Sequence, residues 1–371
     1  MLKRFKILLT CIMISVFQVT NTVNAQILQD STSVNLVKKD IDCIYNHQFN
    51  NAHEINLKIA KLYPGHPVVF LLKGMLTYWK NYPLMYSTPE RKSFEEDMHQ
   101  CIRLSEKNNK VSLEAEYLLA NLCARGMLLK FYSDNKLTLE SIPLASSTYK
   151  YLRRSFNYTN ACSDLYYYTG VYNYYREAYP KVYPAYKPLT FFLPSGDKNT
   201  GLKELHTAAV NAVVLRAESY LLLSWIYLNF ENKYQQALYF SKSLHELYPE
   251  NVVYVALYIK NLLLMKYYTE AEKLIIPTLK ETENKYLKAQ LLVFQGILQE
   301  KKYHDTSLAQ QFYNSGIGMI SLYGVYGNEY TAYAYYGLSR INEQNGEKNN
   351  SRMFQKKAMK LGDFKKINFD K

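Results

Sequence analysis

Cys43 and His47 are spaced so that they could hold a metal ion. They lie four positions apart, and a helix would place both side chains on one face, where both could reach the same ion. They supply only half of a tetrahedral site, and no other cysteine–histidine pair lies at metal spacing nearby. His245-Glu246 is followed by Leu, Tyr and Pro, so the second histidine of a helical zinc motif is missing. We therefore predict neither a metal nor another cofactor.

Phosphate binding and acid–base catalysis have equally weak signals. Gly196 and Gly201 have the spacing of a phosphate-binding loop, but Leu202 follows where that loop needs lysine. Asp197 fits better as the cap of a helix that starts there. The carboxylates of Glu95-Glu96-Asp97 point in different directions on a helix, as expected for a solvated face. A Gly-x-Ser-x-Gly nucleophile motif is absent from the sequence. We predict a protein that is not an enzyme.

Aromatic residues give the strongest binding signal. Tyr168, Tyr172, Tyr175 and Tyr179 repeat at intervals of four, three and four, which places them on one face of a helix. Two readings stay open. The face could be buried between neighbouring helices, or it could line a groove where tyrosines and Arg176 bind a peptide or a sugar.

Residues 179–197 follow this helix and contain four prolines, which predicts an irregular connector. The connector is too apolar for a free linker, so we expect it to be ordered against the helical body. It could border the binding site, or it could fill a gap between two blocks of helices. The candidate partner-binding residues are Tyr168, Tyr172, Tyr175, Arg176, Lys181, Tyr183, Tyr186 and Lys187.

The elements that position these residues are predicted from internal repeats. An aromatic residue, two polar residues and alanine recur at 49–52, 234–237 and 268–271, the last two 34 residues apart. Proline follows the alanine by twelve residues at Pro64 and Pro249, where it would end a helix. In other helices an aromatic residue precedes a small one by four, as in Phe70 to Gly74, which predicts close approach of a partner helix.

The pattern predicts helices throughout and no strands. We expect them at 33–49, 52–63, 67–82, 89–108, 111–131, 138–155, 161–178, 198–213, 215–230, 234–248, 252–266, 268–282, 285–301, 306–320, 327–344 and 347–361.

These features resemble the tetratricopeptide repeat family, whose first helix carries an aromatic and then a small residue, and whose second helix carries alanine and ends near proline. Residues 220–249 match best, although Ser224 and Ala237 are one position farther apart than in the family pattern. Residues 166–202 also faintly resemble a eukaryotic tetratricopeptide family linked to the mitochondrial outer membrane and inclusion clearance. The resemblance implies an all-α fold: an α-solenoid of antiparallel helix pairs with a concave binding surface.

The N-terminus predicts export. Lys3, Arg4 and Lys6 precede an apolar run from 7 to 19, and small residues lead to Ala25, as in a cleaved signal peptide. The expected divisions are a signal peptide at 1–25, helical repeats at 26–178, the connector at 179–197, further repeats at 198–362 and a basic tail at 363–371. The mature protein would then lie in the periplasm or outside the cell.

Charge and composition narrow the partner. The formal net charge is +13, but basic residues are spread along the chain, which disfavours nucleic acid and leaves open association with an anionic membrane surface. We read Cys43, Cys101, Cys123 and Cys162 as buried thiols. The leading hypothesis is a non-catalytic interaction module that binds a protein or peptide. The alternative is a small-molecule or glycan-binding protein that uses the aromatic groove near 166–193, and an enzyme comes third.

Overall fold

The computed structural model describes residues 27, 30–108, 110–190, 193–361 and 369, and these fold into helices without a strand. The α-helices are α2 (Ser31–Tyr45), α3 (Phe49–Leu62), α4 (Pro67–Lys80), α5 (Arg91–Glu106), α6 (Glu114–Asp134), α7 (Thr138–Ser155), α8 (Leu165–Val182), α9 (Lys187–Thr190), α10 (Lys198–Asn211), α11 (Arg216–Asn229), α12 (Tyr234–Leu247), α13 (Val252–Leu264), α14 (Tyr268–Glu281), α15 (Lys285–Leu298), α16 (Thr306–Ile320), α17 (Asn328–Gln344) and α18 (Lys348–Lys360). Shorter helical turns are η1 (Val111–Leu113), η2 (Pro184–Tyr186), η3 (Gln299–Tyr303) and η4 (Ser321–Gly327).

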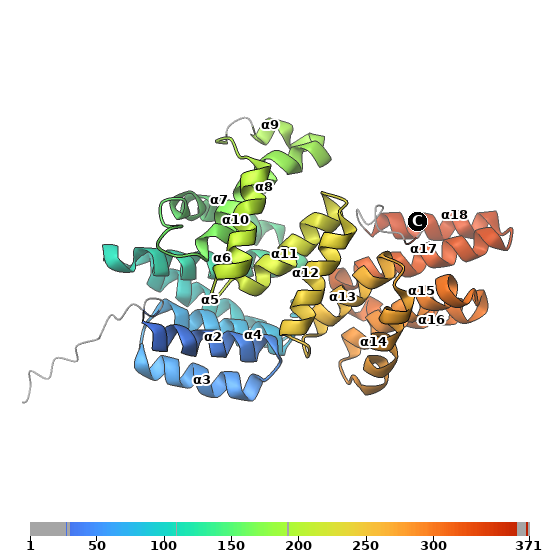
Figure 1. Ribbon diagram of the computed structural model, residues 1–371, viewed down its shortest axis with the longest axis horizontal. Helices are drawn as coiled ribbons and strands as arrows, with labels where there is room; N and C mark the ends of the chain where they lie inside the picture. The colour runs from blue at the N-terminus through green and yellow to red at the C-terminus, as the bar shows by residue number, and fades with distance from the viewer. Residues whose placement is uncertain (1–26, 28–29, 109, 191–192, 362–368, 370–371) are drawn as a thin grey trace, which may run out of the picture.

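Consecutive helices pack as antiparallel pairs, which confirms the predicted solenoid-like, all-α fold (Figure 1). Each predicted helix range corresponds to a helix of the structure, with ends that differ by a few residues. The recurring aromatic of the 49–52, 234–237 and 268–271 motifs is the first residue of α3, α12 and α14. The motif therefore marks the start of the second helix in a pair.

The same turn joins many of these pairs. A residue with positive φ lies two positions before the second helix begins, which is the left-handed conformation that commonly ends helices. The next residue donates its backbone N–H to a carbonyl five or six positions earlier, as Tyr267 does to Leu262 at 2.9 Å. The positions are His47, Lys136, Asn232, Lys266, His304 and Gly346.

Close approach of paired helices occurs where a small residue was predicted to allow it. A side chain at Gly170 would lie 2.8 Å from Leu205 of α10, and one at Gly201 would lie 2.8 Å from the carbonyl of Gly170. Side chains at Gly296 and Gly337 would both overlap the buried ring of Tyr313. The prediction that a small residue four positions after an aromatic or leucine residue admits a neighbouring helix is therefore confirmed at Gly170, Gly296 and Gly337.

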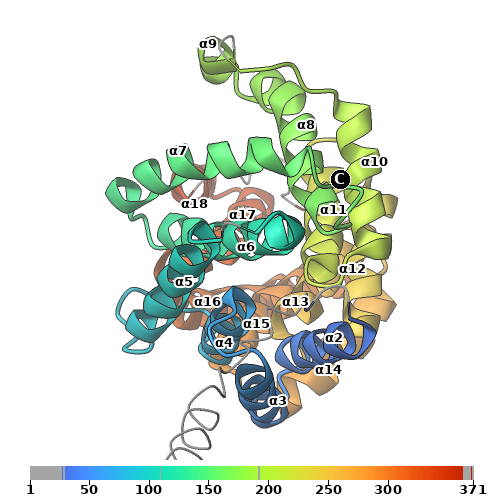
Figure 2. The same cartoon turned by 90° about the vertical axis from the view of Figure 1, so that its left-hand side faces the viewer.

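The array curves until distant helices meet (Figure 2). The ring of Tyr45, at the end of α2, lies 5.2 Å from that of Tyr248 and 6.0 Å from that of Tyr254. The Asn251 amide donates to the backbone carbonyl of Tyr45 at 3.0 Å. These contacts join helices α2, α12 and α13 across 206 residues of sequence.

A second set of aromatic contacts joins the loop after α4 to the C-terminal helices. The Tyr82 ring lies 6.0 Å from that of Tyr286 and 5.9 Å from that of Tyr326. The Tyr326 hydroxyl donates to the carbonyl of Leu84 at 3.0 Å. Buried Tyr286 and partly buried Tyr82 and Tyr326 thus pack between the N-terminal and the C-terminal helices.

One predicted boundary is wrong. We expected residues 179–197 to be irregular because of their prolines, but α8 continues through Pro180 to Val182. Pro180 lies in the last turn of the helix, where it removes a single hydrogen bond, and the Tyr183 N–H donates to the Tyr179 carbonyl at 2.9 Å. Beyond it the chain forms η2 and α9.

Two further observations bear on the sequence predictions. Cys43, Cys101 and Cys123 are buried free thiols, whereas Cys162 is only half-buried. Among the described helices, none is both long and apolar enough to cross a lipid bilayer. The predicted signal peptide at 1–25 lies outside the described residues, as does most of the predicted tail.

Candidate functional site

The predicted tyrosine face divides into two lines in the structure. Tyr168 and Tyr172 are each 8% exposed, so they belong to the core of the helical array. The Tyr168 hydroxyl lies beside the Cys123 thiol. Tyr172 packs edge-on against Phe156, at 5.7 Å between ring centroids, and the guanidinium of Arg153 covers it at 5.2 Å. Tyr168 therefore faces α6 and Tyr172 faces α7, and neither side chain is open to a ligand.

Arg176 continues this first line and braces the chain that returns from α9. Its Nε donates to the Pro194 carbonyl at 3.1 Å, and a terminal nitrogen donates to the Leu193 carbonyl at 3.0 Å. The Tyr172 hydroxyl donates to the same Pro194 carbonyl at 2.7 Å. Residues 193 and 194 are therefore held against α8, as the sequence predicted for the connector. Arg176 therefore has a structural role, because it holds residues 193 and 194 against α8.

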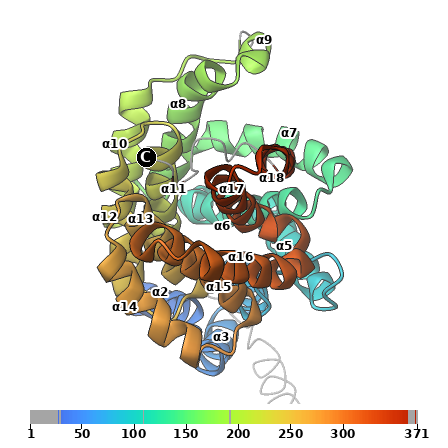
Figure 3. The same cartoon turned by 90° about the vertical axis from the view of Figure 1, so that its right-hand side faces the viewer.

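The start of α10 is fixed next to this brace. Asp197 accepts the Thr200 N–H at 2.6 Å and caps the helix, as predicted. The Lys198 N–H donates to the carboxylate of Glu177 at 2.8 Å. Because α8 packs directly on α10 through Gly170 and Gly201, the connector does not fill a gap between them. In all three overall views, α9 is the outermost element at this end of the molecule (Figures 1, 2 and 3).

The second line, Tyr175, Tyr179 and Tyr183, faces a different neighbour. All three side chains are partly exposed. The rings of Tyr179 and Tyr183 lie 4.6 Å apart, and those of Tyr175 and Tyr179 lie 6.3 Å apart. Phe230, at the end of α11, packs edge-on against Tyr175 at 5.3 Å. Trp225 of α11 is a hydrogen-bonding neighbour of the Tyr175 hydroxyl and is 40% exposed.

We call Tyr175, Tyr179, Tyr183, Trp225 and Phe230 the aromatic strip. Among its members, the sequence did not indicate Trp225 or Phe230 as site residues. The sequence held only an indirect signal for Trp225. Ser224, the small residue of the best-matching repeat, lies on the packed face of its helix, so the next residue, Trp225, points away from that face.

Two of the predicted basic residues lie at the C-terminal end of α8 and at the start of α9. Lys181 is exposed and pairs with Glu177 at 2.6 Å, which is a surface ion pair of little energetic weight. Lys187 is exposed at the start of α9. The backbone of Tyr186 lies in η2, but its side chain is outside the described part of the structure. The structure thus places Tyr183 within the strip beside Tyr175 and Tyr179. Tyr172 and Arg176 face Phe156 and the Pro194 carbonyl instead, and Lys181 turns toward Glu177, away from the strip.

Two carboxylates inside the molecule, Asp164 and Glu218, hold helices in place. Asp164 accepts the backbone N–H groups of Val213, Val214 and Leu215 at 2.7–3.0 Å and so holds the start of α11. Glu218 accepts the Tyr45 hydroxyl, and burial raises the pKa of its carboxyl to about 7. Its contact therefore belongs to the junction between α2 and α11.

Cys43 and His47, which have the spacing of half a metal site, each contact another side chain. The Cys43 thiol faces the Gln48 side chain at 3.5 Å, and the His47 ring stacks on Phe49 at 5.0 Å. Within the ranges that the structure describes, no group of three or more His, Cys, Asp or Glu side chains could hold a metal ion.

Comparison with known proteins does not assign this chain to a family. No protein-family model matches the chain, and no curated protein matches its sequence. The fold and the surface of the chain are therefore the basis for a functional proposal.

Proposed function

We propose that this chain is an exported, non-catalytic scaffold that binds an extended segment of a partner protein along the aromatic strip. The observation that supports the proposal is the strip itself. Two consecutive first helices, α8 and α11, and the residues that cap them contribute five neighbouring aromatic side chains that remain at least partly exposed. Aromatic side chains dominate the energetics of protein interfaces, because they bury much area with little loss of side-chain entropy.

The dimensions of the strip favour a peptide. Tyr175 to Tyr183 is eight residues of helix, which corresponds to roughly 12 Å along the axis at 1.5 Å per residue. An extended peptide advances about 3.3 Å per residue, so three to four residues could lie along α8 alone. Lys181 and Lys187, which are exposed at the C-terminal end of α8 and at the start of α9, favour a partner segment that carries an acidic residue. A glycan could also stack on these rings, and we treat it as an outcome of the test.

Site-specific photocrosslinking tests this proposal. A benzophenone amino acid in place of Tyr179 should crosslink a partner protein in cells of the native organism. The same amino acid in place of Tyr239, which is 61% exposed on α12, provides the matched control. A protein adduct at position 179 and none at 239 supports the proposal. Equal adducts at both positions, or a carbohydrate adduct at 179, would contradict binding of a partner protein at the strip.

Export is tested separately, by the mass of the mature chain. If the signal peptide is cleaved after Ala25, protein recovered from the native organism should begin at Gln26. Intact-mass spectrometry measures this directly. A dominant species that keeps residues 1–25 would overturn the proposal of export by a cleaved signal peptide and leave the strip untouched.

A further inference from the structure

Helix α18 is strongly basic, and among the described residues its side away from α17 is exposed. It contains Lys348, Arg352, Lys356, Lys357 and Lys360 and no acidic residue between positions 348 and 360. It packs on α17 through Ser351, Phe354 and Ala358, and no described helix follows it. Figure 3 shows α17 and α18 nearest the viewer at this end of the molecule.

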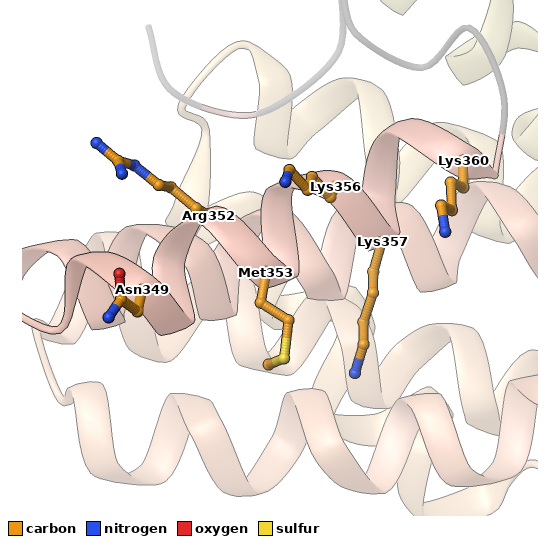
Figure 4. Close-up of a pocket in the computed structure, with 6 residues that line it drawn as sticks. All are labelled: Asn349, Arg352, Met353, Lys356, Lys357 and Lys360. Atoms are coloured by element: carbon orange, nitrogen blue, oxygen red, sulfur yellow. The ribbon is translucent and has the colours of Figure 1, made fainter.

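The free side of α18 forms a continuous stripe. Residues 349, 352, 353, 356, 357 and 360 recur at helical spacing and line a shallow hollow of about 480 Å³ (Figure 4). Arg352, Lys356 and Lys360 are exposed, and within the part of the chain that the structure describes none of them forms an ion pair. Lys357 is different, because its ammonium lies 5.5 Å from the Tyr335 ring and 5.4 Å from the Phe354 ring.

Apolar side chains are exposed among these cations. Met353 is 41% exposed within the stripe, and Met359 is 45% exposed at its edge. A helix face that combines cations with apolar side chains suits the boundary between lipid headgroups and acyl chains, where the cations meet phosphates and the apolar groups leave water. A soluble polyanion would use the cations but would gain nothing from the methionines.

We infer that the free face of α18 docks the protein on an anionic lipid bilayer. The basic face complements the negative charge of acidic phospholipid headgroups, and several cations near such a surface act together. Docking through α18 is independent of the aromatic strip, which lies on α8 and α11. A protein with both surfaces would hold its partner at a membrane.

Vesicle sedimentation tests the inference with the mature chain from Gln26. Vesicles of phosphatidylcholine mixed in equal amounts with phosphatidylglycerol are compared with vesicles of phosphatidylcholine alone. The stripe variant is Arg352→Gln, Lys356→Gln and Lys360→Gln. The control variant, Lys38→Gln, Lys39→Gln and Lys58→Gln, removes the same charge from exposed lysines of α2 and α3. Circular dichroism checks that both variants keep the helical fold.

We expect wild type and control to bind the anionic vesicles and not the neutral ones. Each cation near an anionic surface contributes roughly fivefold to binding, so the stripe variant should bind about 100-fold more weakly. Met353→Ser with Met359→Ser should also weaken vesicle binding without changing retention on dextran sulfate. Equal binding by the stripe and control variants would overturn the inference. Retention on dextran sulfate without vesicle binding would overturn it in favour of a soluble polyanion.

Discussion

Tyrosines of this chain fall into two structural groups, which are separated by the side of the helix that carries them. Tyr45, Tyr254 and Tyr286 are at most 5% exposed and join distant helices. Tyr175 and Tyr179 stay partly exposed and define the aromatic strip. The first group accounts for much of the unusual tyrosine content, 37 of 371 residues, through packing. The second group supports the proposed binding surface.

A buried carboxyl group gives a prediction at the residue scale. Asp40 is fully buried, accepts one hydrogen bond from Asn56 at 2.7 Å, and has a second oxygen without a partner among the described residues. Burial raises the pKa of Asp40 to about 8, against about 3.9 for a free aspartate. The folded state therefore holds a proton that the unfolded state releases. The stabilisation is fully present below pH 4 and is lost as the pH rises toward 8.

The substitution Asp40→Asn should remove this pH dependence. Between pH 5 and pH 8, the wild type should lose up to about 1.4 kcal/mol of unfolding free energy per pH unit from this group. Denaturant unfolding of both proteins at several pH values measures the difference between their unfolding free energies. The contributions of other titrating groups, such as His47, are the same in both proteins and cancel in this difference. The same slope in wild type and variant would mean that Asp40 is not protonated in the folded state.

The spacing of residues in the sequence could assign tyrosines to one face of a helix but could not predict which segments pack against that face. It grouped Tyr172 with Tyr175, since both lie within one turn of a helix. In the structure Tyr172 contacts Phe156 and Pro194, whereas Tyr175 contacts Phe230. The neighbours come from three other segments, and nothing within residues 168–179 encodes which side each segment covers.

At the element scale, the recurring turn explains why pairs form throughout the chain. Its left-handed residue is histidine, lysine, asparagine or glycine in different pairs. A search by residue type therefore misses the turn, although helix positions were predicted well from apolar periodicity. Pro180 shows the opposite problem. Its residue type predicted a break in the helix, but the sequence did not show that it lies in the last turn, where a helix tolerates proline. Local conformation depends on position within an element as well as on residue identity.

Lys266 offers a direct test of the turn. It has φ 60° between α13 and α14 and is exposed, so its side chain is disfavoured there and makes little contact. Lys266→Gly should raise the unfolding free energy by about 0.5–1 kcal/mol, the net of relieved strain and a more flexible unfolded chain. The control Lys273→Gly, on the exposed face of α14, should lower it by about 1 kcal/mol. Destabilisation by both substitutions in thermal or denaturant unfolding would contradict the turn assignment.

At the scale of the whole molecule, the array departs from a simple solenoid. Stacked repeats usually contact only their neighbours, so their stability is a sum of local terms. Here Tyr248 of the α12 end donates to Asp42 of α2 at 3.0 Å and packs on Tyr45. The sequence predicted the helices and their pairing, but such contacts depend on the small rotation between successive pairs, which periodicity does not determine.

Tyr248→Ala should uncouple the first helices from the rest. Loss of a buried aromatic side chain and its hydrogen bond costs roughly 3–5 kcal/mol, concentrated at the junction with α2. Hydrogen exchange should then accelerate in α2 and α3 more than in α15. Tyr313→Ala, which removes a ring packed between α15, α16 and α17, should give the opposite pattern. Equal acceleration in both regions for both variants would show that the chain opens as one cooperative unit, which would contradict a local effect of the junction.

The central claim is that the aromatic strip binds a partner segment, and an affinity measurement tests it most directly. A peptide enriched from a random library on the mature chain is titrated by calorimetry against wild type, against Tyr183→Ala with Trp225→Ala, and against Tyr239→Ala with Tyr267→Ala. The last pair removes two exposed tyrosines of comparable size outside the strip. Because interface aromatic residues often contribute 2 kcal/mol or more, the strip variant should bind at least about 30-fold more weakly, and the control should match wild type. Unchanged affinity in the strip variant, or equal loss in both variants, would contradict the account.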